Sequence, residues 1–166
     1  MDFGLPPADQ VCFIDANILY YSFVSLPTVS DYCTILSKEI VTGARRAATI
    51  SSAVADAVHK VMCSEVVKVH QRPRAGLIGW IKKHPHALEQ LTEFNQAADE
   101  FSKMPLHWLP VGSALLVDAG KIAVRHGLMI NDALNVAAMR ANGLAHLVTN
   151  DDDFDRVPGI TVWKPR

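Results

Sequence analysis

Long apolar runs are missing from this sequence of 166 residues. No stretch approaches the roughly 20 apolar residues that a membrane-spanning helix needs, which argues against an integral membrane protein. Residues 1–10 contain two acids, no base and no apolar segment, so we expect no secretory signal there. These absences favour a cytoplasmic protein that does not contact a membrane.

Cysteine is also scarce. The sequence has three, Cys12, Cys33 and Cys63, and none of them is close to another as in metal-binding or redox pairs. We therefore expect reduced thiols in a reducing compartment, and neither a disulfide scaffold nor a zinc–cysteine site.

Signs of disorder are missing too. The composition, 49% hydrophobic and 20% charged, allows a substantial core. The length is that of one ordinary domain, and we find no internal repeat, low-complexity tract or linker. We predict a single domain over residues 1–166.

The formal net charge is only −1, but it is unevenly distributed. Between His59 and His86 there are six Lys or Arg residues and a single acid, Glu65. One interpretation is a solvated helical surface. The other is a face that binds a polyanion or an acidic partner. In that case the RNA- or partner-binding residues are Lys68, Arg72, Arg74, Lys82 and Lys83.

Apolar stretches and turn residues alternate along the chain. Five short stretches are predicted to be strands, at 11–15, 47–51, 106–111, 145–149 and 160–163. Amphipathic segments with Ser or Asn at the start and Gly or Pro at the end are predicted to be helices. They span 16–24, 30–43, 52–72, 75–84, 86–104, 112–127 and 131–143, with Ser30, Ser52, Ser113 and Asn131 as N-caps.

Strands that alternate with helices indicate an α/β fold. We predict a central parallel sheet of about five strands with helices on both faces, a three-layer α/β/α arrangement. The helical stretch of roughly 60–104 separates two strands widely, and we expect it to form an arm or a cover on the same domain.

Acidic residues occur where the predicted elements join. Asp15 ends the first strand, Asp56 lies about one turn inside the helix after the second, and Asp132 opens the helix before the fourth. Asp151 and Asp153 follow the fourth strand, in a run with four carboxylates in five residues. The carboxyl ends of parallel strands converge on one crevice, so these acids could form one acidic cup.

Each acid also has an ordinary structural explanation. Asp132 suits a helix start, Asp56 could be a solvated helix residue, and residues 151–155 could be a polar turn. Asp15 is harder to explain in this way, because a carboxylate at the end of a buried strand needs a partner.

A divalent cation would make such crowding tolerable. Close carboxylates otherwise force some members to take up protons. Mg²⁺ and Mn²⁺ prefer oxygen ligands, and Mg²⁺ keeps several waters, so a few carboxylates suffice. Such an ion can activate a water and stabilise charge at a phosphate, whereas zinc is disfavoured because the junctions carry no His or Cys.

The sequence resembles a PIN-domain ribonuclease of the kind that forms the toxin in bacterial VapBC toxin–antitoxin pairs. The resemblance runs from "VCFIDANILYY" to "GITVWKP". It is most specific in "HGLMINDALNVAAMRANGLAHLVTNDDDFDRVPGITVWKP", with its Asn-Asp-Ala-Leu, Thr-Asn-Asp-x-Asp-Phe and Val-Pro-Gly pieces.

The resemblance assigns roles to individual residues. It implies catalytic carboxylates at Asp15, Asp56, Asp132 and Asp151, and metal ligands at Asp15, Asp132, Asp151 and Asp153. Asn17, Thr149 and Asn150 match the family's supporting polar residues. The second acid of the family is usually Glu, in a piece ending E-x-x-H-K. Here it is Asp56, one methylene shorter, which could reach a metal directly or through water.

The resemblance also implies an activity and partners. These are Mg²⁺- or Mn²⁺-dependent endonucleolytic cleavage of single-stranded or looped RNA by a metal-activated water, homodimerisation, and inhibition by a cognate antitoxin. Three alternatives remain. A haloacid-dehalogenase-like phosphatase would need a second Asp where the chain has Asn17. The others are a receiver-like Mg²⁺-binding module and a degenerate PIN-like domain that only binds RNA or a protein.

Overall fold

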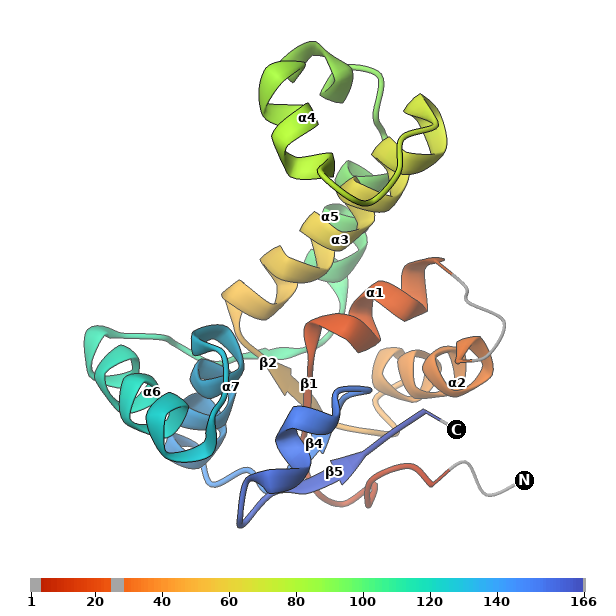
Figure 1. Cartoon of the computed structure of the whole chain (residues 1–166). Helices are drawn as coiled ribbons and strands as arrows, with labels where there is room; N and C mark the ends of the chain where they lie inside the picture. The colour runs from red at the N-terminus through yellow and green to blue at the C-terminus, as the bar shows by residue number, and fades with distance from the viewer. Residues whose placement is uncertain (1–3, 25–28, 166) are drawn as a thin grey trace.

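The computed structural model of the chain describes residues 4–24 and 29–165. Its five strands form one parallel sheet in the order β3-β2-β1-β4-β5 (Figure 1). Every strand lies inside a stretch predicted to be one, so the α/β class and the parallel sheet are confirmed. The strands are β1 (Cys12–Ile14), β2 (Ala47–Thr49), β3 (His107–Trp108), β4 (His146–Val148) and β5 (Thr161–Trp163).

The strand order excludes the receiver-like alternative. In that doubly wound fold the order is 2-1-3-4-5, with the first strand between the second and the third. Here β1 pairs with β2 on one side and with β4 on the other. The loops after β1 and β4 are therefore neighbours at one edge of the sheet.

The helices follow the sequence pattern with one clear exception. The predicted helix 86–104 is wrong in its first half, where a short 3-10 helix precedes an α-helix that begins at Glu93. No described helix combines the length and apolarity that a bilayer crossing requires. The α-helices are α1 (Ala16–Val24), α2 (Ser30–Val41), α3 (Ser51–His70), α4 (Leu77–Lys83), α5 (Glu93–Lys103), α6 (Ser113–His126) and α7 (Ile130–Ala141), and the 3-10 helices are η1 (Pro85–Leu88) and η2 (Asp152–Arg156).

The predicted N-caps are wrong by one or two residues. The residues at the N-cap positions are Val29, Ile50, Gly112 and Met129. Ile50 is extended and follows β2 directly, so the end of the strand, and not a side-chain cap, determines where α3 begins. The predicted stop at Gly127 is confirmed, because this residue ends α6 with a φ of 65° that favours glycine.

Helices cover both faces of the sheet, and β1 explains why. Successive strand residues point to opposite faces. Cys12 and Ile14 pack in a core that includes residues of α1, α2, α3 and α5. Phe13 packs in a second core with residues of α6 and α7. The fully buried run Cys12–Ile14 is thus apolar at every position, as in a strand covered on both sides.

The second half of α3 projects from this body together with α4, η1 and α5, forming an arm (Figure 1). The arm has a small core of its own, with Val66, Leu77, Ile81 and Leu91 buried together. Glu65 ties the arm's two longer helices to each other. Its carboxylate is 3% exposed and accepts hydrogen bonds from the backbone N–H groups of Thr92, Glu93 and Phe94 at 2.6, 2.9 and 3.0 Å.

Replacing Glu65 with Ala is expected to lower the free energy of unfolding by about 3 kcal/mol, because three N–H groups at the start of α5 lose a charged acceptor. Urea denaturation measures this loss. Glu89→Ala is the control, since its exposed carboxylate only pairs with His86. An equal loss in both variants would contradict the capping role of Glu65.

Candidate functional site

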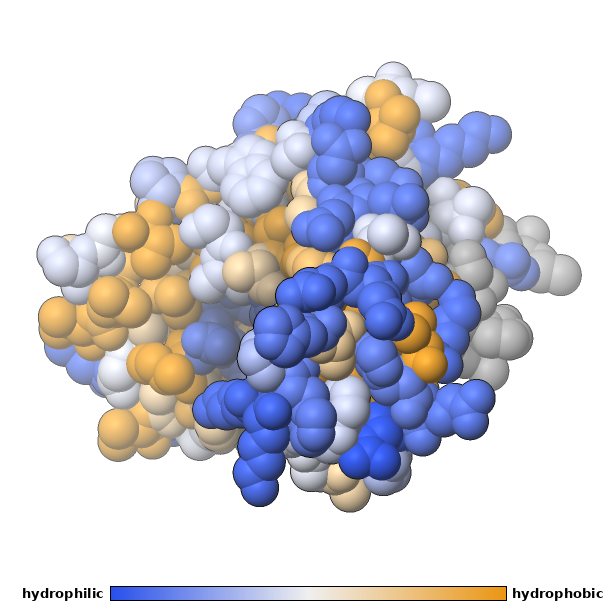
Figure 2. Space-filling view, turned by 90° about the horizontal axis from the view of Figure 1, so that it is seen from above, coloured by the Kyte–Doolittle hydropathy of each residue, from blue (hydrophilic) through white to orange (hydrophobic). Residues whose placement is uncertain are grey.

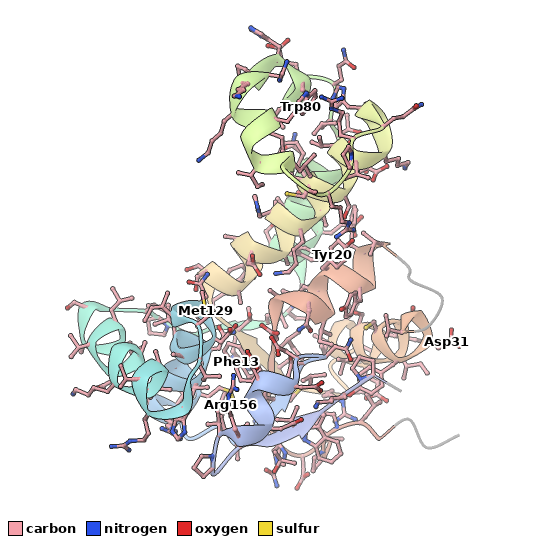
Figure 3. The ribbon with its side chains drawn as sticks, in the orientation of Figure 1. Phe13, Tyr20, Asp31, Trp80, Met129 and Arg156 are labelled. Atoms are coloured by element: carbon pink, nitrogen blue, oxygen red, sulfur yellow. The ribbon has the colours of Figure 1, made fainter. Side chains whose placement is uncertain are left out.

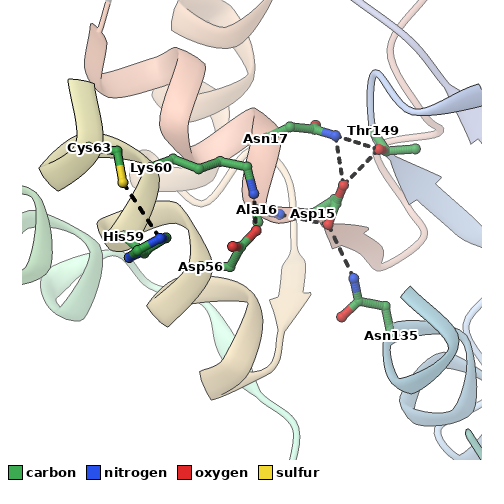
Figure 4. Close-up of polar contacts among 9 residues, drawn as sticks. All are labelled: Asp15, Ala16, Asn17, Asp56, His59, Lys60, Cys63, Asn135 and Thr149. Atoms are coloured by element: carbon green, nitrogen blue, oxygen red, sulfur yellow. Dashed lines mark hydrogen bonds and ion pairs between the residues drawn. The ribbon is translucent and has the colours of Figure 1, made fainter. Parts of the chain in front are cut away.

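Asp15 stands at the end of β1, at the centre of the sheet edge. It is 6% exposed, and its carboxylate accepts four hydrogen bonds. Oδ1 accepts from the Ala16 N–H at 2.8 Å and from Asn135 Nδ2 at 3.1 Å. Oδ2 accepts from Asn17 Nδ2 and from Thr149 Oγ1, both at 2.8 Å. Figure 4 shows these partners arriving from α1, from the loop after β4 and from α7.

Asn17 and Thr149 join the loops after β1 and β4. Asn17 Nδ2 donates to Thr149 Oγ1 at 2.9 Å, and its Oδ1 accepts from the Asn150 N–H at 3.2 Å. Thr149 Oγ1 also accepts from the Asp151 N–H at 3.1 Å. These side chains therefore link Asp15 to the start of the acidic run 151–155.

The four acids of that run divide into two pairs. Lys164 forms ion pairs with Asp152, at 2.6 Å, and with Asp155. Asp151 instead begins η2, where its Oδ1 accepts from the Asp153 N–H at 2.8 Å. Asp153 pairs with Arg156 at 2.6 Å, and Arg156 also donates to the carbonyl of Gly127 at 3.1 Å. Arg156 thus holds η2 beside the loop that leads into α7.

Asp132, in the first turn of α7, is affected by three of the other acids. Burial, together with the negative charges of Asp15, Asp151 and Asp153, raises the pKa of Asp132 to about 6. Burial likewise raises the pKa of Asp15, against hydrogen bonds from Thr149 and Ala16. The structure therefore brings together Asp15, Asp132, Asp151 and Asp153, which we call the acidic cluster.

Asp56 lies beside the acidic cluster and is paired with a lysine. In α3 it forms an ion pair with Lys60, one helical turn later. The positive charge of Lys60 lowers the pKa of both Asp15 and Asp132. Its ammonium group therefore stabilises the negative charge of the cluster as well as that of Asp56 (Figure 4). His59 contacts Cys63, and it forms no ion pair with an acid among the described residues.

Two residues of this site, Asn135 and Lys60, are not among those predicted from the sequence. Asn135 lies three positions after Asp132, on the same face of α7, and that spacing could have indicated it. Lys60 lies one turn after Asp56 on α3, and this spacing could have indicated the ion pair.

The five basic residues predicted to bind RNA or a partner lie elsewhere, on the arm. Lys68 is paired with Glu93 at 2.5 Å. The guanidinium carbon of Arg72 lies 4.9 Å from the ring centre of Trp80, and Arg74 donates to Ser64 Oγ at 3.4 Å. Lys82 and Lys83 are exposed at the end of α4. The structure does not bring these side chains to the acidic cluster.

The donor set fits a hydrated Mg²⁺ or Mn²⁺ better than a closed metal site. Within the described residues, no three His, Cys, Asp or Glu side chains already form a metal-binding group. Asp15 accepts four hydrogen bonds, about as many as a carboxylate can. Asp132 and the second oxygens of Asp151 and Asp153 accept none among the described residues. A few free carboxylate oxygens suit an ion that keeps several waters.

Comparisons with known proteins identify the family and the fold. The PIN domain family model matches residues 12–160. The fold is similar to VapBC2 from Rickettsia felis bound to a DNA fragment from its promoter, with a TM-score of 0.54, 18% identity, and 93% of this chain and 98% of that chain covered.

Two further structures are similar. A toxin–antitoxin complex from Klebsiella pneumoniae has a TM-score of 0.56 and 14% identity, with 90% and 95% of the two chains covered. PAE2754 from Pyrobaculum aerophilum has a TM-score of 0.54 and 17% identity, with 92% and 90% covered. No curated protein sequence matches. Because the family model covers nearly the whole chain, this protein belongs to the PIN domain family.

Proposed function

We propose that this protein is a Mg²⁺- or Mn²⁺-dependent endoribonuclease that cleaves single-stranded or looped RNA and acts as the toxin of a toxin–antitoxin pair. The observation that carries the proposal is the acidic cluster, in which three carboxylates raise the pKa of Asp132. A fold does not keep mutually repelling acids for its own stability, so their convergence supports a role in binding a cation.

Each residue of the cluster has a distinct role in this proposal. Asp132, Asp151 and Asp153 hold the ion through their free oxygens, and Asp15 is a fixed negative charge held by four hydrogen bonds. Asn17, Thr149, Asn150 and Asn135 position these acids. A bound divalent ion lowers the pKa of a water and neutralises charge at the phosphate. In this proposal Lys60 donates to a phosphate oxygen, and its ion pair with Asp56 orients it.

One observation favours a second candidate, a PIN domain that binds RNA or a protein without cleaving. All four hydrogen-bonding positions of Asp15 are occupied, so the most buried acid of the cluster adds no ligand to the other three unless it loses a donor such as Asn17, and an ion with so few ligands could bind too weakly for catalysis. The two candidates differ in metal binding, which can be measured.

The proposal includes two protein partners, a cognate antitoxin and a second copy of the chain. The structural relative from Klebsiella pneumoniae is a toxin–antitoxin complex, which supports the first. An exposed apolar surface on α6 and around the start of α7 supports the second, and Figure 2 shows apolar side chains on that side of the molecule. Its residues are Leu116, Val117, Val124, Met129 and Ile130.

Calorimetric titration with Mn²⁺ tests the proposal. Wild-type protein is expected to bind Mn²⁺ and to gain thermal stability as the concentration rises, since the unfolded chain has no acidic cluster. The Asp132→Asn Asp151→Asn double variant is expected to lose both effects. Lys60→Met should bind Mn²⁺ more tightly than wild type, because it removes a competing positive charge.

The control is Asp152→Asn Asp155→Asn, which removes two carboxylates from the same run but leaves the cluster intact. It should bind Mn²⁺ as wild type does. Absence of binding by wild-type protein, or equal binding by both double variants, would contradict the proposed metal site.

A further inference from the structure

The tip of the arm carries positive charge without compensating acids. Residues 72–84 include four cations and no Asp or Glu. Elsewhere Lys60, Lys68 and Lys164 each pair with a carboxylate. Among the described residues, no carboxylate lies within 4 Å of the charged groups of the four tip cations. The four are Arg72, Arg74, Lys82 and Lys83.

An aromatic stack lies among these cations. The rings of Trp80 and His84 are stacked with centroids 4.6 Å apart and an interplanar angle of 19°. His84 Nδ1 donates to the carbonyl oxygen of Trp80 at 2.9 Å, which fixes the ring. Arg72 lies over Trp80, and His84 is exposed. Cations interleaved with stacked rings are the combination that binds single-stranded nucleic acids, through phosphates and base faces together.

The tip is held in place by the body of the arm. Leu77 and Ile81 of α4 are buried against Val66 of α3, so the helix that bears Trp80 and Lys82 is anchored. Figure 2 looks down onto the arm and shows hydrophilic side chains gathered on it. A surface that is ordered before binding loses less conformational entropy when a ligand arrives.

The helix α3 connects the tip to the acidic cluster. Asp56 lies near its start beside the cluster, and His70 ends it at the arm. Fourteen residues of α-helix span about 21 Å at 1.5 Å per residue. Figure 3 shows Trp80 at the far end of the arm from Phe13 and Arg156, which lie with the sheet and η2. About six nucleotides would cover this distance at the roughly 3.4 Å spacing of a stacked strand.

We propose that the arm tip binds the backbone and one base of a single-stranded RNA about six nucleotides from the bond held at the acidic cluster. The inference rests on the proposed ribonuclease function and adds a second contact point to it. The arm thereby selects long unpaired segments: an RNA that reaches both places gains affinity over one that reaches only the cluster. An acidic protein segment would use the cations but not the stacked rings.

Fluorescence anisotropy with labelled oligouridine of 4 and of 16 nucleotides tests the inference, with Ca²⁺ in place of Mn²⁺ so that the acidic cluster still holds a divalent cation. Lys82→Ser Lys83→Ser should weaken binding of the 16-mer at least fivefold at low salt and flatten the slope of log affinity against log salt by about 1.4, for two lost phosphate contacts. Binding of the 4-mer should change less than twofold. His84→Ala should weaken 16-mer binding severalfold without changing the slope, because it removes stacking alone.

Lys38→Ser Arg125→Ser is the matched control, since it removes two exposed cations from α2 and α6. It should leave the slope unchanged, and thermal melting should show that every variant is folded. An equal effect of both double variants, or no change in slope at the tip, would overturn the inference. So would a poly-glutamate peptide that displaces the 16-mer as well as unlabelled oligouridine does. A wild-type protein that binds the 16-mer through the tip but never cleaves it with Mn²⁺ would refute only the proposed function.

Discussion

Replacing Asp132 with Asn is expected to lower the rate of RNA cleavage by on the order of a thousandfold, the loss that follows when a group that stabilises charge in the transition state is removed. Asn keeps the size of the side chain but cannot neutralise a cation. Asp132 accepts no hydrogen bond from another described residue, so the fold loses no partner. Rates measured on a labelled single-stranded RNA with Mn²⁺ check this expectation.

The same substitution is expected to stabilise the metal-free protein, with a gain that grows above about pH 4 and is complete above about pH 6. The folded-state pKa of Asp132, about 6, lies above the ordinary value of an Asp. The unfolded chain therefore releases this proton first, and stability falls as pH rises from about 4 to about 6. Because Asp132 is partly exposed, we expect a loss of roughly 1–2 kcal/mol, or a few degrees in melting temperature.

Melting curves of the metal-free protein at pH 4.5 and pH 8 measure this difference. Asp132→Asn should raise the melting temperature at pH 8 and change it little at pH 4.5. Asp152→Asn is the control, because Asp152 is exposed and paired with Lys164 outside the cluster. It should retain full cleavage and gain no stability at pH 8. A stable, fully active Asp132→Asn protein would refute the role of the cluster.

Much of the site follows from rules that act along short stretches of sequence. Cys12–Ile14 is apolar throughout and ends in an acid, and Thr149 follows another such strand. In a parallel sheet the carboxyl ends of these strands meet, so the proximity of Asp15 to the loop after β4 could be predicted. The same pattern, a strand followed by an acid, occurs at His146–Val148 and Asp151 and predicts that the loop after β4 also contributes an acid to this edge.

Other features depend on contacts between residues far apart in sequence. Asn135 donates to Asp15 across 120 positions, so its spacing from Asp132 places it on the same face of α7 but does not identify Asp15 as its partner. Lys164, which pairs with Asp152 and Asp155 but not with Asp151 or Asp153, directly follows the last strand. The start of α5 depends on Glu65, which lies in another helix, so local propensity placed it too early.

The ends of the RNA products are expected to be a 5′-phosphate and a 3′-hydroxyl, with no cleavage in EDTA. A metal-free ribonuclease must activate the RNA 2′-hydroxyl with a general base, usually a histidine. Among the described residues of the acidic cluster and its hydrogen-bond partners there is no histidine, and His59 contacts Cys63 instead. Carboxylates that hold a cation favour attack by water in line with the departing 3′ oxygen.

Mass spectrometry of the products of a short oligoribonucleotide decides between these chemistries. When water cleaves the bond, the two products together weigh about 18 Da more than the substrate, the mass of one water. When the 2′-hydroxyl attacks instead, the products are a 2′,3′-cyclic phosphate and a 5′-hydroxyl, and their summed mass equals that of the substrate. His59→Ala should cleave as wild type does, since His59 is exposed and outside the cluster. Cyclic phosphate ends, or undiminished cleavage in EDTA, would show that the acids serve another purpose even though the fold is that of a PIN domain.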